Sequence, residues 1–359
     1  MNITEYMANA VEHIITDSMK AAFRNPKETV FLLKYSLVQK SARATRTEYE
    51  KQSRHIPPFL IASITTTCNL FCKGCYARAN KSCGEHLQQN QLSAQRWDEL
   101  FDEAGQLGIS FILLAGGEPL MRREIIEKAA EHKSIIFPIF TNGTMIEDST
   151  ITFFDDNRNL LPILSIEGNQ QQTDERRGAG TYDKLMKVMN QLNQKGIFYG
   201  ASVTVTTENI ETVTSDEFVG NLYQNGCKVL FYVEYVPVTA STKQLAPTNT
   251  ERDTLARRQA ELRKTYENMI ILSFPGDEEK LGGCLAAGRG FFHINANGGA
   301  EPCPFSPYSD TSLKEKSLLE ALESPLFRRM REEGMLAGEH DGGCLLFQKE
   351  EQVKALLTK

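Results

Sequence analysis

The sequence predicts an α/β fold with a mainly parallel sheet. After residue 58, apolar runs of strand length alternate with amphipathic segments of helical length, and six such units follow one another. Alternation of this kind implies parallel pairing through right-handed crossovers. It is compatible with a doubly wound sheet or with a barrel, although six units are too few for a complete eight-fold barrel.

The individual elements follow from the same patterns. Strands are expected at residues 59–66, 111–115, 135–140, 162–166, 198–204 and 229–236. Helices are expected between and after them, at residues 93–107, 122–132, 146–154, 182–194, 215–224 and 251–266, and Ser93 can cap the first turn of its helix.

Composition limits the class of protein. The chain has 359 residues, of which 41% are hydrophobic and 24% charged, which is ordinary for a large globular domain with a smaller one attached. No apolar run approaches the roughly 18 residues of a membrane span. The net charge of -6 gives no reason to expect a nucleic-acid partner.

Three cysteines, Cys68, Cys72 and Cys75, come directly after the first expected strand. Iron–sulfur clusters are usually held by four cysteine thiolates, so a compact set of three predicts a four-iron cluster with one iron open to another ligand. Zinc is disfavoured because no histidine has the spacing of a zinc finger. Disulfides are disfavoured because eight cysteines are too few for a disulfide scaffold and the chain shows no secretory leader.

The stretch from Cys68 to Tyr76, CNLFCKGCY, resembles the signature of the radical S-adenosylmethionine (SAM) superfamily. The resemblance implies a [4Fe-4S] cluster whose open iron binds the methionine part of SAM. It also implies a six-unit partial (β/α)6 barrel, TIM-like, with SAM at the carboxyl ends of the strands. We expect a reducing cytoplasm, because exposed iron–sulfur clusters are damaged by oxygen.

Two further motifs follow the second and third expected strands. Gly116, Gly117, Glu118 and Pro119 would let the backbone approach a ligand and offer acceptors to an ammonium group, although the same residues can form a tight turn. The segment resembles the motif with which the superfamily binds the amino group of SAM. Asn142, after the third strand, resembles a further loop of the family, although Asn-Gly alone indicates only a turn.

A fourth motif follows the fourth strand. Ser165 to Gly168 and the later Arg177 are similar to a segment of the branch that contains peptide-modifying maturases. The resemblance implies that Ser165 and Arg177 bind the SAM carboxylate, for which the planar guanidinium is suited. Glu167 stands where the family usually has aspartate, and Thr173 where it has histidine, so no role is carried over to those two positions.

The C-terminal part contains Cys284, Cys303 and Cys344. Residues 291–295 and 300–303 flank a tight turn and predict a hairpin that brings Cys284 near Cys303, followed by a helix at 317–332. This pattern resembles the SPASM or "twitch" extension, which implies one auxiliary [4Fe-4S] cluster. Three buried structural cysteines are the alternative. The fourth ligand could be Asp341, Cys227 or the substrate.

Two other cysteines receive plainer interpretations. Cys227 lies just before the sixth strand and is expected in the core more than at a cluster, and Cys83, in a polar segment, is expected to be an incidental thiol. The predicted domains are a helical N-terminal extension (1–58), the partial barrel (59–270) and the auxiliary-cluster domain (271–359). In the extension, apolar residues recur at helical spacing, which predicts a helix pair packed on the barrel or, alternatively, peripheral membrane contact.

The resemblance also implies the chemistry. SAM would be cleaved reductively to a 5'-deoxyadenosyl radical that takes hydrogen from a substrate C–H bond, while the protein binds, orients and excludes water. Glu234 and Tyr235, at the end of the sixth strand, are candidate catalytic residues, of which alternation lets only one point inward. The expected partners are a reductase, flavodoxin or ferredoxin and a peptide substrate. The alternatives are a small molecule or lipid as substrate, or a non-enzymatic electron carrier.

Overall fold

The computed structural model describes residues 25–84, 90–274, 283–337 and 344–357. Its centre is one sheet with the strand order β7-β6-β5-β4-β3-β2-β1-β8-β9. The first seven strands pair in parallel, and the short β8 and β9 form an antiparallel hairpin that joins the edge of β1. The strands are β1 (Phe59–Thr65), β2 (Phe111–Gly116), β3 (Phe137–Thr141), β4 (Leu160–Ser165), β5 (Gly200–Val205), β6 (Val229–Glu234), β7 (Ile270–Phe274), β8 (His293–Ile294) and β9 (Ala300–Glu301).

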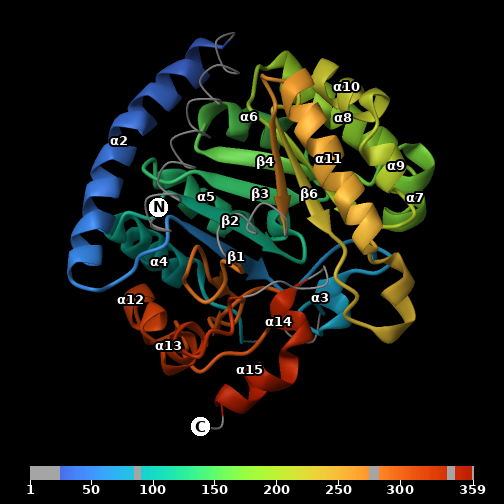
Figure 1. Cartoon of the computed structure of the whole chain (residues 1–359). Coiled ribbons are helices and arrows are strands. Elements are labelled where there is room, and N and C mark those ends of the chain that lie inside the picture. Colours follow the sequence, from blue (N-terminus) through green and yellow to red (C-terminus); the bar gives the residue numbers. More distant parts are fainter. Residues whose placement is uncertain (1–24, 85–89, 275–282, 338–343, 358–359) are drawn as a thin grey trace.

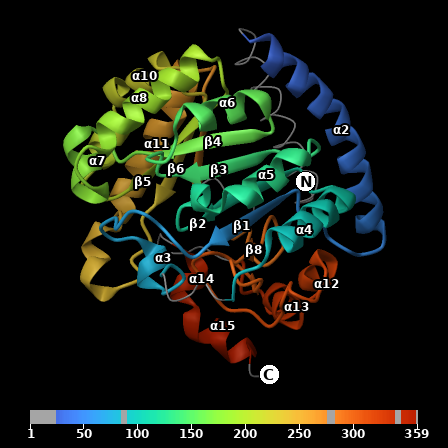
Figure 2. The same cartoon turned by 180° about the vertical axis from the view of Figure 1, so that it is seen from behind.

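Helices connect the parallel strands and cover the sheet from outside. The long α2 and α4 lie on one flank, and α7, α8, α10 and α11 lie on the opposite flank (Figures 1 and 2). The helices are α2 (Pro26–Lys51), α3 (Tyr76–Ala79), α4 (Ala94–Leu107), α5 (Arg123–Glu131), α6 (Asp148–Asp156), α7 (Gln170–Arg177), α8 (Thr181–Gln194), α9 (Ile210–Val213), α10 (Asp216–Gln224), α11 (Asn249–Thr265), α12 (Leu318–Leu322), α13 (Pro325–Glu332), α14 (Leu345–Gln348) and α15 (Glu350–Leu357). Short 3-10 turns, Pro119–Arg122 and Ala240–Leu245, follow β2 and β6.

The sheet curls into a partial barrel. The rings of Phe140 on β3 and Phe231 on β6 meet edge to face, with centroids 5.2 Å apart, although two strands separate them. Such a contact is possible only where the sheet is strongly curved, because neighbouring strands are about 4.8 Å apart. The sheet stays open between β7 and β9. The α/β partial-barrel prediction is therefore confirmed.

Most predicted elements are present, with boundaries displaced by one or two residues. Ser93 caps α4 by accepting a hydrogen bond from the Arg96 amide at 3.1 Å, and Gly108 ends the helix in a left-handed conformation. Several features were not predicted: the division of the 317–332 helix into α12 and α13, the seventh strand β7, and the helices α3, α7, α9, α14 and α15. The division has a local cause, because Ser324 caps a new helix that begins with Pro325.

The N-terminal extension packs on the barrel through one face of α2. The Tyr35 hydroxyl donates a 2.6 Å hydrogen bond to the carbonyl of Ser110, and the buried Arg46 donates to the carbonyl of Gly108 and, at 3.1 Å, to the Ser110 hydroxyl. The expectation of a helix packed on the barrel is met by α2. The apolar residues 7–23, on which the expected helix pair and membrane contact also depend, lie outside the described residues.

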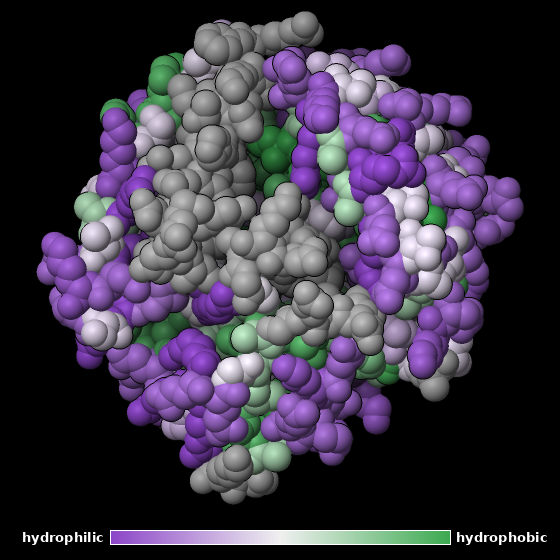
Figure 3. Space-filling view, in the orientation of Figure 1, coloured by the Kyte–Doolittle hydropathy of each residue, from purple (hydrophilic) through white to green (hydrophobic). Residues whose placement is uncertain are grey.

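The surface is mainly polar, as expected for a protein that buries its apolar side chains in its own core. The face seen in Figure 3 is mainly hydrophilic, and apolar surface shows chiefly in recesses beside the atoms drawn in grey. Within the described ranges, no helix has the length and apolar character needed to cross a bilayer.

The docking of α2 can be tested by removing its buried cation. We expect Arg46→Ala to lower the free energy of unfolding by roughly 2–3 kcal/mol, because the carbonyl of Gly108 and the hydroxyl of Ser110 lose a charged donor. Urea unfolding followed by circular dichroism measures the change. Lys40→Ala, on the exposed side of the same helix, should change stability by less than about 0.5 kcal/mol. Equal effects would contradict this account.

Candidate radical SAM site

The cysteine loop lies between β1 and α3, at the carboxyl edge of the parallel sheet. Cys68, Cys72 and Cys75 are half-buried and form no disulfide. Arg78 holds the loop in shape by donating to the carbonyls of Cys68 at 3.2 Å and Leu70 at 2.8 Å. The sequence prediction that these thiols face the catalytic edge of the barrel fits this position.

Burial favours the protonated thiol at Cys68 and Cys72. It raises the pKa of Cys68 to about 11 and also raises the pKa of Cys72. Iron binds the thiolate, so metal binding must release these protons. Over the described ranges, no three His, Cys, Asp or Glu side chains converge as the ligands of one metal ion do. Three cysteines in one half-buried loop are the type of ligand that iron–sulfur clusters use.

Gly116 and Gly117 bring β2 against the cysteine loop. A Cβ atom at Gly117 would lie 1.9 Å from the Thr67 carbonyl oxygen and 3.0 Å from the amide nitrogen of Cys68. At Gly116, where φ is +133°, a Cβ would lie 2.4 Å from the Thr65 carbonyl oxygen. Only glycine permits this contact, so the motif is more than a tight turn.

Glu118 ties the end of β2 to the end of β3. Its buried carboxylate accepts hydrogen bonds from the Thr141 hydroxyl at 2.7 Å and from the Asn142 amide at 2.8 Å, while burial raises its pKa. The Asn142 side chain donates to Asn69 of the cysteine loop at 2.8 Å. Glu118 therefore positions Asn142, and Pro119 begins the following 3-10 turn.

Glu167 is the centre of the polar network after β4. It is 1% exposed and accepts a hydrogen bond from Arg176 at 2.9 Å and two from Arg177, one of them 2.8 Å long. Arg177 also lies 3.9 Å from the Cys72 sulfur, and the Arg176 carbonyl accepts the Lys73 amide at 2.8 Å. Ser165, on β4, shares a 3.2 Å hydrogen bond with Ser202 on β5.

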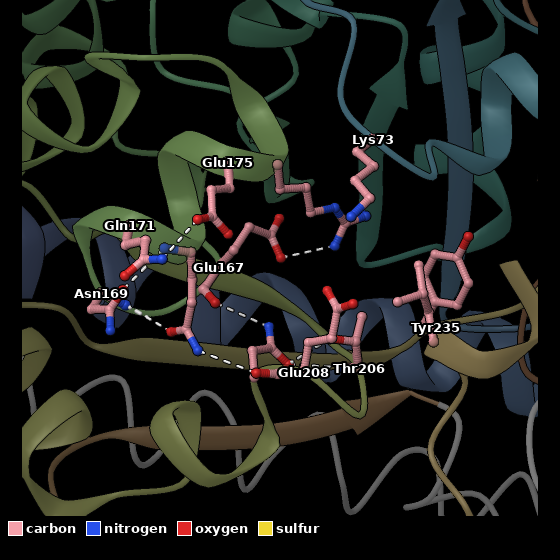
Figure 4. Close-up of a pocket in the computed structure, with 12 residues that line it drawn as sticks. Lys73, Glu167, Asn169, Gln171, Glu175, Thr206, Glu208 and Tyr235 are labelled. Atoms are coloured by element: carbon pink, nitrogen blue, oxygen red, sulfur yellow. Dashed lines mark hydrogen bonds and ion pairs between the residues drawn. The ribbon is translucent and has the colours of Figure 1, made fainter.

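A polar pocket of about 400 Å³ opens beside this network. Figure 4 shows Lys73 and Tyr235 on one side of it, Asn169, Gln171 and Glu175 on the other, and Thr206 and Glu208 between them. The volume lies within the range of small-molecule sites, about 300–1,000 Å³. Cations and carboxylates both line it, so it suits a polar occupant.

The two candidate catalytic residues, Tyr235 and Glu234, lie in different surroundings. Tyr235 lines the pocket, and its hydroxyl packs against Gly74 of the cysteine loop, 2.8 Å from where a Cβ would stand. The Glu234 carboxylate instead lies 3.8 Å from Arg252 on α11, the helix that covers the strand. The structure therefore does not place Glu234 at the site, because alternation turns it toward the covering helix.

The three C-terminal cysteines lie together. Cys284, Cys303 and Cys344 are all buried, and the pKa of Cys303 is raised first by burial and then by the thiols of Cys344 and Cys284. Asp341 lies outside the described residues. Cys227 is fully buried at the amino end of β6, where its thiol donates to the Val229 carbonyl, so the core interpretation fits it.

A buried network of His293, Glu301 and Ser63 was not predicted by any sequence pattern. His293 on β8 lies 2.7 Å from Glu301 on β9 and 2.8 Å from the hydroxyl of Ser63 on β1. Tyr76 lies nearby, and its pKa is raised first by burial and then by the thiols of Cys75 and Cys303. Ser63 and His293 are 230 residues apart, so no local pattern could have predicted the contact.

The comparisons with known proteins identify the domain. The sequence model of the radical SAM superfamily matches residues 62–219, a span that contains the cysteine loop, the Gly-Gly-Glu-Pro motif and the Glu167 network. The chain therefore carries a radical SAM domain, and the resemblance seen in its sequence is confirmed. Proteins of this superfamily use SAM and a [4Fe-4S] cluster.

Relatives act on different substrates. Fe-coproporphyrin III synthase of Methanosarcina barkeri is 28% identical over 184 residues, which cover 50% of this chain and 44% of the synthase. PqqA peptide cyclase of Rhizobium meliloti is 23% identical over 70% of this chain and 68% of the cyclase. This chain thus matches less than half the length of the synthase.

A solved structure shares the fold. Streptococcus suis SuiB, bound to its precursor peptide SuiA, aligns with a TM-score of 0.66 and 22% identity, covering 86% of this chain and 72% of SuiB. At this identity the likeness concerns the fold, which here extends beyond the radical SAM domain.

Gly117 tests the close approach of β2 to the cysteine loop. We expect Gly117→Ala to destabilise the protein by roughly 2–3 kcal/mol, because the new methyl group overlaps backbone atoms that cannot move independently. Gly105→Ala is the matched control, since its Cβ would meet nothing closer than 3.5 Å inside a helix, where alanine is favoured. Urea unfolding of both variants decides, and a neutral Gly117→Ala would refute the constraint.

Glu167 tests the charge network. We expect Glu167→Gln to cost about 3 kcal/mol of folding free energy, because two largely buried arginines lose their shared counter-ion. Glu175→Gln, at an exposed carboxylate on α7, the helix that carries both arginines, should stay within about 0.5 kcal/mol of wild type. Chemical denaturation at neutral pH measures both, and similar values for the two variants would show that Glu167 has no special role.

Proposed function

We propose that the protein is a radical SAM enzyme that modifies a side chain of a peptide or protein by removing hydrogen from an unactivated C–H bond. The observation that carries the proposal is the convergence of three motifs on the cysteine loop. Asn142 after β3 contacts Asn69, Arg177 after β4 contacts Cys72, and Gly117 after β2 contacts Cys68. An electron carrier has no need of this convergence.

The residues fit the cofactors of the superfamily. Cys68, Cys72 and Cys75 would hold three irons of a [4Fe-4S] cluster, and the carbonyls around Gly116 and Gly117 would accept from the amino group of SAM. When bound, the two cofactors would supply one-electron cleavage of SAM and a 5'-deoxyadenosyl radical. The protein side chains would position and shield the reacting groups.

These side chains position and shield the reacting groups. Glu167 fixes Arg177 by accepting hydrogen bonds from the Nε and Nη2 atoms of the guanidinium. The Nη1 atom, beside Cys72, is left to bind the SAM carboxylate together with Ser165. Tyr235 closes the pocket against Gly74 and is our candidate for orienting the substrate. The reaction and the role of each residue are parts of the proposal.

We further propose that Cys284, Cys303 and Cys344 hold an auxiliary cluster. Their joint burial supports this, since three thiols that only filled core space would have no reason to share one location. The ring of Tyr76, next to Cys75, packs on the ring of Phe305, two residues after Cys303, with centroids 5.0 Å apart, so a substrate would lie near both cysteine groups. The fourth ligand remains Asp341 or the substrate.

A peptide is the preferred substrate for two reasons. One relative is named PqqA peptide cyclase, and the fold is that of SuiB, which was solved with a precursor peptide. Transformation of a small molecule is the second candidate, favoured by the similarity to Fe-coproporphyrin III synthase. Either reaction requires a reductase, flavodoxin or ferredoxin as electron donor.

Iron content and SAM cleavage test the proposal together. After anaerobic reconstitution, wild type should hold about eight irons and the Cys68→Ala, Cys72→Ala, Cys75→Ala triple variant about four, and only wild type should form 5'-deoxyadenosine with dithionite and SAM. Cys227→Ala, which removes a core thiol at the far end of β6, should retain both clusters.

Each failure has a distinct meaning. Loss of all iron in the triple variant would exclude the auxiliary cluster. Iron binding without 5'-deoxyadenosine formation in wild type would exclude the enzyme.

A further inference from the structure

The outer face of α2 carries an apolar stripe. Among the described residues, eight large hydrophobic side chains are exposed, and four of them lie on this one helix: Val30, Leu33, Leu37 and Val38. Leu37 is the most exposed of the four, at 66%. Single exposed apolar residues are normal on a protein surface, but four on one helix indicate a surface that binds a partner.

The stripe lies opposite the face of α2 that packs on the barrel. The buried residues of the helix recur at intervals of three or four and form one face: Glu28, Leu32, Tyr35, Gln39, Ala42 and Arg46. With 3.6 residues per turn, Val30, Leu33 and Leu37 fall on the other side of the helix. Both ribbon views show α2 along the outside of the molecule (Figures 1 and 2). The barrel therefore does not cover the stripe.

Two lysines border the stripe. Lys34 and Lys40 are each three residues from Leu37, so they lie on either side of it around the helix axis. Both are exposed, and neither has an ion pair within the part of the chain that the structure describes. From Thr29 to Thr47 the sequence contains no acidic residue. An anionic partner would therefore meet cations and no like charge along this stretch of α2.

An anionic membrane surface fits this combination better than another protein does. Protein–protein interfaces are rich in aromatic side chains and arginine and poor in lysine. Aliphatic side chains bordered by lysines are instead the composition of helices that lie in the interface of a bilayer. A dimer through the stripe would bring the lysines of two copies together, and no carboxylate between Thr29 and Thr47 could pair with them.

We propose that the outer face of α2 docks the protein on the surface of an anionic bilayer. Val30, Leu33 and Leu37 would enter the boundary between head groups and acyl chains, and Lys34 and Lys40 would contact lipid phosphates. Figures 1 and 2 show α3, which follows the cysteine loop, away from α2, so docking would leave the candidate site uncovered. Docking needs neither a cluster nor SAM, so it can fail without affecting the proposed reaction.

Vesicle binding tests the proposal. The full chain is sedimented with vesicles of phosphatidylcholine, either alone or mixed with phosphatidylglycerol. Wild type should bind the mixed vesicles, and added salt should weaken binding because it screens the lysines from the phosphates. Leu33→Ser combined with Leu37→Ser should lower the partition coefficient about tenfold, because two apolar side chains no longer enter the bilayer. Lys34→Glu combined with Lys40→Glu should lower it by a similar factor.

Matched controls separate the stripe from the rest of the surface. Lys187→Glu combined with Lys264→Glu makes the same change of net charge on α8 and α11, which lie on the opposite flank, and should bind as wild type does. Leu357→Ser, which removes an exposed leucine from the end of α15, should also bind as wild type does. Thermal unfolding checks that each variant is folded.

The outcomes are distinct. Equal binding by wild type and the Leu33, Leu37 variant would overturn the role of α2, and no binding of mixed vesicles by wild type would overturn docking altogether. A dimer in light scattering that the leucine variant dissociates would assign the stripe to a second copy of the chain. Vesicle binding that appears only after residues 1–24 are removed would assign the stripe to that segment.

Discussion

The shared ion pair of Glu167 with Arg176 and Arg177 is the interaction on which the geometry of the candidate site depends. A carboxylate that is 1% exposed is costly unless it is paired, and the two guanidinium groups here offset that cost together. The two arginines also fix the position of the cysteine loop. Arg176 holds the amide of Lys73, and Arg177 approaches Cys72, so β4 and α7 fix the middle of the cysteine loop.

Backbone contact fixes the start of the loop, where no side chain could do so. Gly117 lets β2 touch Thr67 and the amide of Cys68, and Glu118, one residue later, binds the end of β3. The loop is thus held by β2 at one end, by Arg78 from within, and by α7 in the middle. A binding site held at several points needs little reorganisation when a ligand arrives.

Sequence patterns predicted the repeating part of the fold and the residue types of the site. The six strands from β1 to β6 are apolar runs with clear boundaries, and the glycines and cysteines stand out by spacing. The patterns failed where local signals were weak. The helix α7 is almost wholly polar and so shows no apolar period of its own, and β7 is an apolar run of only five residues. The approach of the Glu234 carboxylate to Arg252 on α11 is decided by packing and has no local sequence signal.

The sequence by itself determined which chemistry the chain can support, because three cysteines spaced along eight residues restrict the ligand whatever the fold. It also determined the parallel sheet, since alternating strands and helices leave few other topologies. Only the tertiary structure decided which side chains act together. Glu167 with two arginines and Ser63 with His293 are contacts that arise when separate segments fold against one another. Short-range sequence patterns do not encode such contacts.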